Sequence, residues 1–320
     1  MKLFFNELSV LPKRIFIGFS GGIDSRVLFD VLLHDPVVLA HKIELILVNV
    51  NHHTDITETP LSILAAKIAE DYKVQVHLLH VTAQCPKGAS LEAFMREERY
   101  RLFNALLLEG DVLVTGHHLD DQAETFLLNL MRGSGLQGLS AMAPVRLQGL
   151  GCLWRPLLHY TKQELRAYAI AKSLQWLEDP TNKDIMLDRI FLRTEILPKL
   201  TERWPKAKEV LARTASHVRH SQEVLDGYLQ VHLKNLVVEG ALNLKALKLL
   251  PEAQGILLLK AYLDRFDYRL GSAQLQQIYQ DFVLTDNDAA PLFQYRGATL
   301  TRVKHFLHVD MHSKIQKNPL

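Results

Sequence analysis

A regular alternation of short apolar runs with amphipathic stretches is the feature that most constrains the fold of this 320-residue chain. Four nearly continuous, β-branched runs predict buried parallel strands, and each is followed by apolar residues at helical spacing. Repeated βαβ crossovers of this kind form an α/β fold, a doubly wound, mainly parallel sheet with helices on both faces. We expect strands at 14–19, 44–51, 75–81 and 111–115, and helices at 24–34, 58–72, 90–108 and 120–131.

The later part of the chain has a different pattern. Thr161 and Glu164 form a capping box that starts one more helix of the first domain. From Trp204 to Phe282 the chain is helical and amphipathic in pattern, and residues 292–309 alternate as short strands. We place a domain boundary near residue 215. This gives an α/β domain at 1–215 and a smaller, mostly helical domain at 216–320.

Composition excludes several classes of protein. Hydrophobic residues make up 48% and charged residues 22% of the chain, which excludes a disordered protein. The chain contains no apolar run of about 18 residues, the length needed to span a bilayer. No signal peptide is evident, so we expect a cytoplasmic protein. Only Cys85 and Cys152 occur, too few for a disulfide framework or a cysteine metal site.

A glycine-rich segment follows the first predicted strand and opens a helix. Its two glycines permit a tight turn in which several N–H groups face a phosphate, and the helix N-terminus favours the negative charge. The alternative is an ordinary strand-to-helix turn. No kinase-type or dinucleotide-type glycine motif is present. We predict an ATP-binding loop formed by Ser20, Gly21, Gly22, Ile23, Asp24 and Ser25, in which Asp24 can hold Mg²⁺.

A second group of polar residues runs from the end of the fourth predicted strand into a helix. Asp121 and Glu124 are three residues apart and share one face of that helix, whose first turn points to the same sheet edge as the glycine-rich loop. This pair can attract an ammonium group or coordinate Mg²⁺. A metal site on the adjacent His117 and His118 has weaker support because the two side chains diverge. We expect either Asp120 or Asp121 to cap the helix.

Several motifs resemble those of one family. The loop SGGIDS is similar to that of ATP pyrophosphatases, which release pyrophosphate after attack on the α phosphorus. The run from Gly116 to Met142, GHHLDDQAETFLLNLMRGSGLQGLSAM, resembles the signature region of the tRNA(Ile)-lysidine synthetases. Segments 155–158, 178–182 and 189–193 resemble further motifs of that family in the same order. The similarity covers residues 14–310.

The resemblance implies a two-step reaction on an isoleucine tRNA with a CAU anticodon. ATP adenylates the C2 carbonyl oxygen of the wobble cytidine, and the ε-amino group of L-lysine then displaces AMP to form lysidine. The implied cofactors and partners are ATP, Mg²⁺, L-lysine and this tRNA, with no membrane. The oligomeric state stays open, and a homodimer is compatible with the sequence.

The resemblance also implies roles for individual residues. Ser20 to Ser25 would bind ATP, Asp24 and Asp121 would hold Mg²⁺, and Asp121 with Glu124 would bind lysine. A carboxylate or His117 would accept the proton of the amine. Arg99, on a helix that also carries Arg96, would stabilise the charge of the adenylate; alternatively, both are surface arginines paired with Glu92 or Glu97.

The segment from Asp188 to Arg219 contains eight basic and four acidic residues. Charge alone leaves open an ordinary solvated helical face. In the frame of the resemblance, Arg189, Arg193 and Arg203 would contact tRNA phosphates, and the second domain would help to select the tRNA.

The sequence departs from the family at two positions and leaves rivals open. His52 to Asp55 replaces the usual H-G-L-R, and Ile190 replaces an asparagine. Longer relatives continue into a further C-terminal domain, whereas this chain stops near residue 320. A tRNA thiolase would need a reactive cysteine that this chain lacks. Amide-forming synthetases would need a glutaminase domain or other motifs. A non-catalytic nucleotide-binding module would not need Asp24, Asp121 and Glu124.

Overall fold

The computed structural model describes residues 1–51, 59–177, 188–266, 268, 270–285, 291–295 and 298–311. The chain forms two compact units, Met1–Arg219 and His220–Leu320. Helix α10 (Ala207–Leu236) runs across this division, and the predicted boundary at residue 215 falls inside the same helix. Segments 52–55 and 178–182, noted above for their sequence, lie outside the described residues. No helix in the described part is long and apolar enough to cross a membrane.

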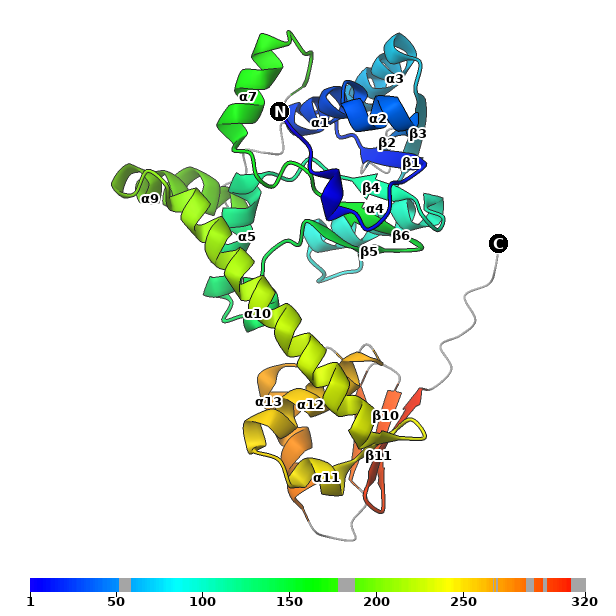
Figure 1. Ribbon diagram of the computed structural model, residues 1–320, viewed down its shortest axis with the longest axis vertical. Helices are drawn as coiled ribbons and strands as arrows, with labels where there is room; N and C mark the ends of the chain where they lie inside the picture. Colours follow the sequence, from blue (N-terminus) through cyan, green and yellow to red (C-terminus); the bar gives the residue numbers. More distant parts are fainter. Residues whose placement is uncertain are drawn as a thin grey trace. The chain divides into compact units, whose positions relative to one another are not determined.

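The first unit is built on a six-stranded sheet with the order β3-β2-β1-β4-β6-β5 (Figure 1). All neighbouring strands pair in parallel except β5 and β6, which are antiparallel. The predicted α/β fold with a mainly parallel sheet is confirmed. The strands are β1 (Arg14–Gly18), β2 (Glu44–Asn51), β3 (Gln75–His80), β4 (Val112–Val114), β5 (Val145–Gln148) and β6 (Gly151–Trp154).

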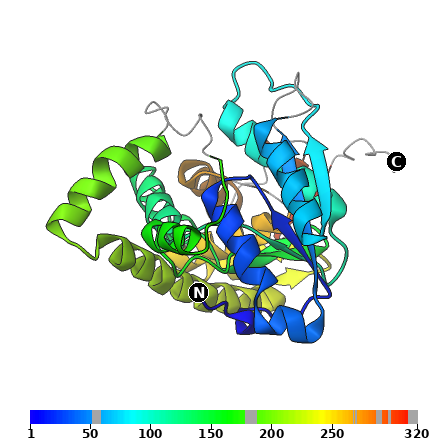
Figure 2. The ribbon, with the colours of Figure 1, turned by 90° about the horizontal axis from the view of Figure 1, so that it is seen from above.

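Helices cover both faces of this sheet because successive strand residues point to opposite sides. Ile15 and Ile17 of β1 pack in a core with α1, α3 and α7, whereas Phe16 packs in another with Phe103 of α4 and Leu107 just after it. Figure 2 shows the blue helix α1 along the sheet from above. The helices are α1 (Ile23–Leu33), α2 (Pro36–His41), α3 (Pro60–Tyr72), α4 (Leu91–Leu106), α5 (Leu119–Met131), α6 (Leu136–Leu139), α7 (Lys162–Ala171), α8 (Asp188–Phe191) and α9 (Leu197–Arg203), with a 3-10 turn at Phe5–Glu7 and a π-helical stretch at Leu192–Ile196.

The first unit contains one local feature that the sequence predicted, a capping box, and one that it did not, a hairpin. The capping box of α7 is confirmed, since Thr161 Oγ1 accepts from Glu164 N–H and Glu164 Oε2 accepts from Thr161 N–H. The hairpin of β5 and β6 was not predicted. Its short strands carry little periodic signal, and Leu147 of β5 is 87% exposed.

The second unit combines helices with a five-stranded antiparallel sheet of order β7-β8-β11-β10-β9. Strands β7 and β8 correct the prediction of continuous helix between Trp204 and Phe282, whereas the strands predicted within 292–309 are present. Leu258, Tyr262 and Phe282 lie in its core. Its further elements are β7 (Val237–Val238), β8 (Ala241–Asn243), α11 (Leu244–Lys248), α12 (Glu252–Asp264), α13 (Ser272–Ile278), a π-helical stretch (Tyr279–Leu284), β9 (Leu292–Tyr295), β10 (Ala298–Val303) and β11 (Phe306–Met311).

Candidate active site at the carboxyl edge of the sheet

The glycine-rich loop lies between β1 and α1 and is held by its own hydroxyl groups. Gly21 adopts φ +81°, and a Cβ there would lie 2.9 Å from Leu61, so only glycine fits this turn. Ser25 Oγ donates to the carbonyl of Gly22 at 2.9 Å and lies 3.2 Å from Ser20 Oγ. Gly22 is the N-cap of α1, without a capping side chain. The N-terminus of α1 is thus open to an anion.

The loop between β4 and α5 packs backbone to backbone against the start of α1. A Cβ on Gly116 would lie 2.9 Å from the carbonyl carbon of Asp24 and 3.1 Å from Ser25 N. Real Cβ contacts are longer, so glycine is required at this position. The phosphate loop and the polar residues before α5 therefore lie side by side, as their positions after neighbouring strands predicted.

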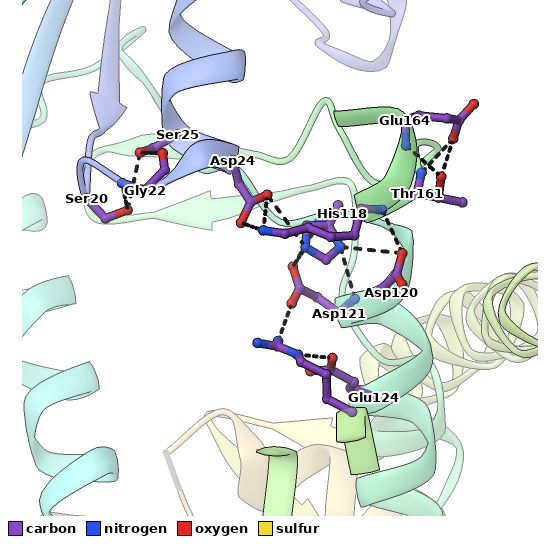
Figure 3. A network of polar contacts seen from close by, with 12 residues as sticks. Ser20, Gly22, Asp24, Ser25, His118, Asp120, Asp121, Glu124, Thr161 and Glu164 are labelled. Atoms are coloured by element: carbon purple, nitrogen blue, oxygen red, sulfur yellow. Dashed lines mark hydrogen bonds and ion pairs between the residues drawn. The ribbon is translucent and has the colours of Figure 1, made fainter. Parts of the chain in front are cut away.

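His118 is a buried connector between these two segments (Figure 3). It is the N-cap of α5: its N–H donates to Asp121 Oδ2 at 3.0 Å, and its Nδ1 lies 3.4 Å from Asp121 N. Its Nε2 lies 3.4 Å from Asp121 Oδ2 and 3.9 Å from Asp24 Oδ1. Asp121 therefore takes part in the cap, as expected for one of the two aspartates, but the N-cap residue is His118.

Each carboxylate of this centre has a basic partner. Lys162 Nζ, at the start of α7, lies 2.6 Å from both carboxylate oxygens of Asp24. Lys208 of α10 pairs with Asp120, which also accepts from Lys162 N–H at 2.8 Å. Sequence analysis did not single out these lysines. The one available signal for Lys162 was its place in the first turn of the helix opened by the capping box.

Arg193 joins two of the predicted site residues. Its Nε donates to Glu124 Oε1 at 2.6 Å and its Nη2 to Glu124 Oε2 at 2.9 Å, which makes a bidentate pair. Nη2 also lies 3.3 Å from Asp121 Oδ1. Arg193 belongs to the π-helical stretch after α8, a geometry frequent at functional sites. The guanidinium thus lies in the centre formed by Asp121 and Glu124.

The surroundings shift the pKa values of these carboxyls in different directions. Burial raises the pKa of Glu124, and the bonds from Arg193 only partly oppose it. Burial would also raise the pKa of Asp121, but His118 and His117 outweigh it and the pKa is lowered. For Asp120, the bonds from Lys208 and Lys162 N–H outweigh burial and lower the pKa. Glu124 therefore accepts a proton more readily than the two aspartates.

His117, in the same loop before α5, is a weak base. Burial, against the opposing charge of Asp121, lowers the pKa of His117 to about 3. Its Nδ1 lies 2.8 Å from Thr115 Oγ1. The ring is therefore neutral at pH 7, and the neighbouring Arg155, Arg96 and Arg99 also disfavour its protonation.

Four arginines surround Tyr100 and form what we call the arginine cage. Arg96 and Arg146 each place Cζ 5.3 Å from the centroid of the Tyr100 ring. Arg155 is 3% exposed, lies close enough to Tyr100 to affect its pKa, and donates to the carbonyl of Ala143 at 2.6 Å. Burial lowers the pKa of Arg99, the fourth member. In the described part of the chain, no carboxylate forms an ion pair with Arg96, Arg99, Arg146 or Arg155.

The remaining predicted arginines lie near this centre or on the surface. Arg189 of α8 is close enough to Arg99 to contribute to the lowering of the Arg99 pKa. Arg203 ends α9 and lies with Cζ 6.0 Å from the Trp204 ring centroid. Arg203 and Trp204 are exposed. The structure thus groups Arg193 with the carboxylates and Arg189 with the arginine cage.

A cleft of about 330 Å³ opens beside the carboxylates. This volume is at the small end of ligand sites. Both members of the Glu124–Arg193 pair face it. It is lined by His118, Asp120, Glu124, Lys162, Arg193, Leu197, Pro198, Thr201 and Lys208.

Comparison with known proteins assigns the chain first to a class and then to a family. Residues 1–200 match the PP-loop domain, an ATP-binding domain. The chain is 36% identical over 297 residues to the tRNA(Ile)-lysidine synthase of Photorhabdus laumondii, which covers 92% of this chain and 67% of that protein. It is 37% identical over 288 residues to the enzyme of the same name from Coxiella burnetii, with 89% and 64% covered. The chain belongs to the tRNA(Ile)-lysidine synthase family and spans about two thirds of the length of these relatives.

A solved structure is similar in fold. The U34-tRNA thiolase of Methanococcus maripaludis superposes with a TM-score of 0.54 at 21% identity, covering 65% of this chain and 72% of the thiolase. This likeness supports the PP-loop fold of the first unit.

Proposed function

We propose that the protein attaches L-lysine to C2 of the wobble cytidine in an isoleucine tRNA with a CAU anticodon. In the first step the C2 carbonyl oxygen attacks the α phosphorus of ATP and pyrophosphate leaves. In the second step the ε-amino nitrogen of lysine attacks C2, the bond to the AMP oxygen breaks, and the amine loses a proton. The observation that carries the proposal is a pair of carboxylates beside the phosphate loop, the buried Glu124 and the half-buried Asp121, that already binds a cationic side chain.

ATP would bind with its β and γ phosphates on the loop from Ser20 to Ser25. The positive φ of Gly21 and the open N-terminus of α1 support this placement. Asp24 and Asp121 both approach His118 Nε2, so two carboxylates converge beside the loop. Mg²⁺ is commonly held by one or two carboxylates together with substrate phosphates, which these residues fit. Among the described residues no group of three or more metal ligands exists.

Lysine would bind through its amines at Asp121 and Glu124. The guanidinium group of Arg193 already bridges both carboxylates, which supports this place as a binding site for a cationic amine. The adjoining cleft offers room for the rest of the amino acid. Glu124 is better suited than His117 to accept the proton of the nucleophilic amine, because its pKa is raised whereas that of His117 is lowered to about 3.

Arg99 would stabilise the negative charge that develops on the α phosphate. It lies in a group of arginines without a carboxylate partner in the described part of the chain, and an arginine stays charged even when burial lowers its pKa. Arg189 and Arg203 would contact tRNA phosphates, and the unit from His220 would help to select the tRNA. The expected location is the cytoplasm.

The experiment combines the protein with ATP, Mg²⁺, labelled L-lysine and an unmodified CAU-anticodon isoleucine tRNA transcript. Label on the tRNA, AMP and pyrophosphate are measured together. We expect equal amounts of label and AMP, and no label with a transcript that carries uridine at the wobble position. ATP cleavage without lysine transfer would refute the lysine step, and absence of both signals would refute the proposed reaction.

A further inference from the structure

The arginine cage holds more positive charge than the contacts around it require. Arg155 is almost fully buried, and its Nε has no hydrogen-bond partner. Arg146 donates to Gln148 and Arg155 to a carbonyl, so their partners in the described residues are neutral. Leaving a buried cation such as Arg155 without counter-charge is costly. A cluster of this kind is stable when an anion completes it.

The positive field of the four arginines acts on Tyr100. Burial normally raises the pKa of a phenol, yet the pKa of Tyr100 is lowered because Arg96, Arg155, Arg99 and Arg146 outweigh burial. The guanidinium groups of Arg96 and Arg146 also lie over the Tyr100 ring, each 5.3 Å from its centroid. The cage is thus a cationic site built around one aromatic ring.

The location of the cage separates it from the phosphate loop. Arg146 lies on β5 and Arg155 directly follows β6, whereas the loop follows β1. In the sheet, β6 and β5 are the second and third neighbours of β1. With about 4.8 Å between strands, the arginines lie about 10–15 Å along the edge from the loop. The phosphates of one nucleotide seated on the loop therefore leave the outer part of the cage without an anion.

We propose that Arg96, Arg146 and Arg155 around Tyr100 bind a backbone phosphodiester of the substrate RNA. Guanidinium groups suit this task because they present several donors to phosphate oxygens and keep their charge when desolvated. The contact would orient the RNA at the carboxyl edge, where the wobble base meets the adenylating site. The inference rests on the proposed function, since it takes the RNA to be the substrate.

The test uses Arg146→Ala, because Arg146 is exposed on the edge strand β5 and its removal leaves the core intact. The matched control is Arg101→Ala, which removes the same charge from α4 but from a side chain paired with Glu98 outside the cage. The probe is an anticodon stem-loop transcript with the CAU anticodon. Its affinity is measured at several salt concentrations, and ATP affinity is measured on the same proteins without RNA.

We expect Arg146→Ala to weaken RNA binding about tenfold, as for loss of a hydrogen bond to a charged group. The slope of log affinity against log salt should become shallower by about 0.7–0.9, the amount for one lost phosphate contact. Arg146→Lys should restore much of the slope, and ATP affinity should be unchanged. Arg101→Ala should leave affinity and slope close to wild type.

Three results would overturn the inference: an unchanged slope in Arg146→Ala, an equal effect of Arg101→Ala, or an equal loss of ATP affinity, which would assign the cage to the nucleotide. The slope reports backbone contacts and does not depend on lysine transfer. Failure of wild-type protein to transfer lysine would therefore count against the proposed function alone, and an unchanged slope with active protein against the cage alone.

Discussion

The carboxylate centre around His118 and the arginine cage around Tyr100 lie along one edge of the same sheet, but they treat charge in opposite ways. Asp24, Asp120 and Glu124 each have a lysine or arginine partner. In the described residues the four cage arginines have no carboxylate partner. The carboxylate centre is neutralised within the protein, whereas the cage keeps its charge for a ligand. A ligand of the carboxylate centre must therefore replace a lysine or arginine that is already bound there, whereas a ligand of the cage adds a counter-charge. Substitutions can distinguish these two cases.

The largest effect is expected where the carboxylate centre meets the phosphate loop. Asp24→Asn keeps the shape of the side chain but leaves Lys162 without its ion pair and removes the proposed Mg²⁺ ligand. We expect formation of AMP and pyrophosphate to fall by at least about 10²–10³-fold, the range for loss of one preorganised electrostatic group. A rate within about threefold of wild type would remove Asp24 from the adenylation step. Circular dichroism controls for folding.

Glu124→Gln separates the two chemical steps. Because Glu124 is proposed to bind the amine and accept its proton, we expect the KM for lysine to rise and transfer to slow by about 10²-fold, within the range for general base catalysis. Pyrophosphate release should change by less than about threefold. Steady-state lysine titration and a pyrophosphate assay measure the two steps. Equal loss in both would move Glu124 from lysine binding to the structure of the whole centre.

Gly116→Ala tests whether close packing couples the two loops. The new Cβ would lie 2.9 Å from the Asp24 backbone, so the loops must move apart. We expect a loss of about 1–3 kcal/mol in the free energy of unfolding, as for overpacked sites, and a fall in both chemical steps. Urea denaturation gives the first quantity. Gly110→Ala, at a glycine with no atom near its Cβ position but with φ +83°, is the control for strain from a positive φ.

The smallest effect concerns acid stability. The folded-state pKa of Asp120 is lowered, because the bonds from Lys208 and Lys162 N–H outweigh the opposing effect of burial, so the pair stabilises the protein at pH values above 3.8, the ordinary pKa of an aspartate. That stability is lost as the pH falls through the lower folded pKa. In Lys208→Ala burial would be less opposed, so this part of the acid dependence should shrink or reverse. Denaturation between pH 3 and 7 should show that the pH dependence of the free energy of unfolding differs by about 1 kcal/mol between wild type and Lys208→Ala. Identical profiles for both proteins would remove the pair as a source of pH dependence.

The parallel strands β1 to β4 and the helices between them were predictable because these strands are continuous apolar runs and these helices have clear periodicity, whereas the hairpin β5–β6 and the strands β7 and β8 were not. The positions of the phosphate loop and of Asp121 and Glu124 followed from the rule that ligand groups lie after parallel strands. The cationic partners did not follow, because Lys162 pairs with an acid 138 residues away and Lys208 with one 88 residues away. Arg146 stands on a short edge strand whose pattern is too weak to place it. Only tertiary structure brings these residues together.

Arg193 makes the carboxylate centre selective before any substrate arrives. A guanidinium tethered to the same chain competes for Asp121 and Glu124 at the high effective concentration of an intramolecular partner. Sodium, potassium and free polyamines must outcompete it without the benefit of further contacts. A substrate that also fills the neighbouring cleft gains such contacts. The bound arginine therefore acts as an internal counterion. The affinity measured for any amine reflects the difference in free energy between its own binding to the carboxylates and that of Arg193.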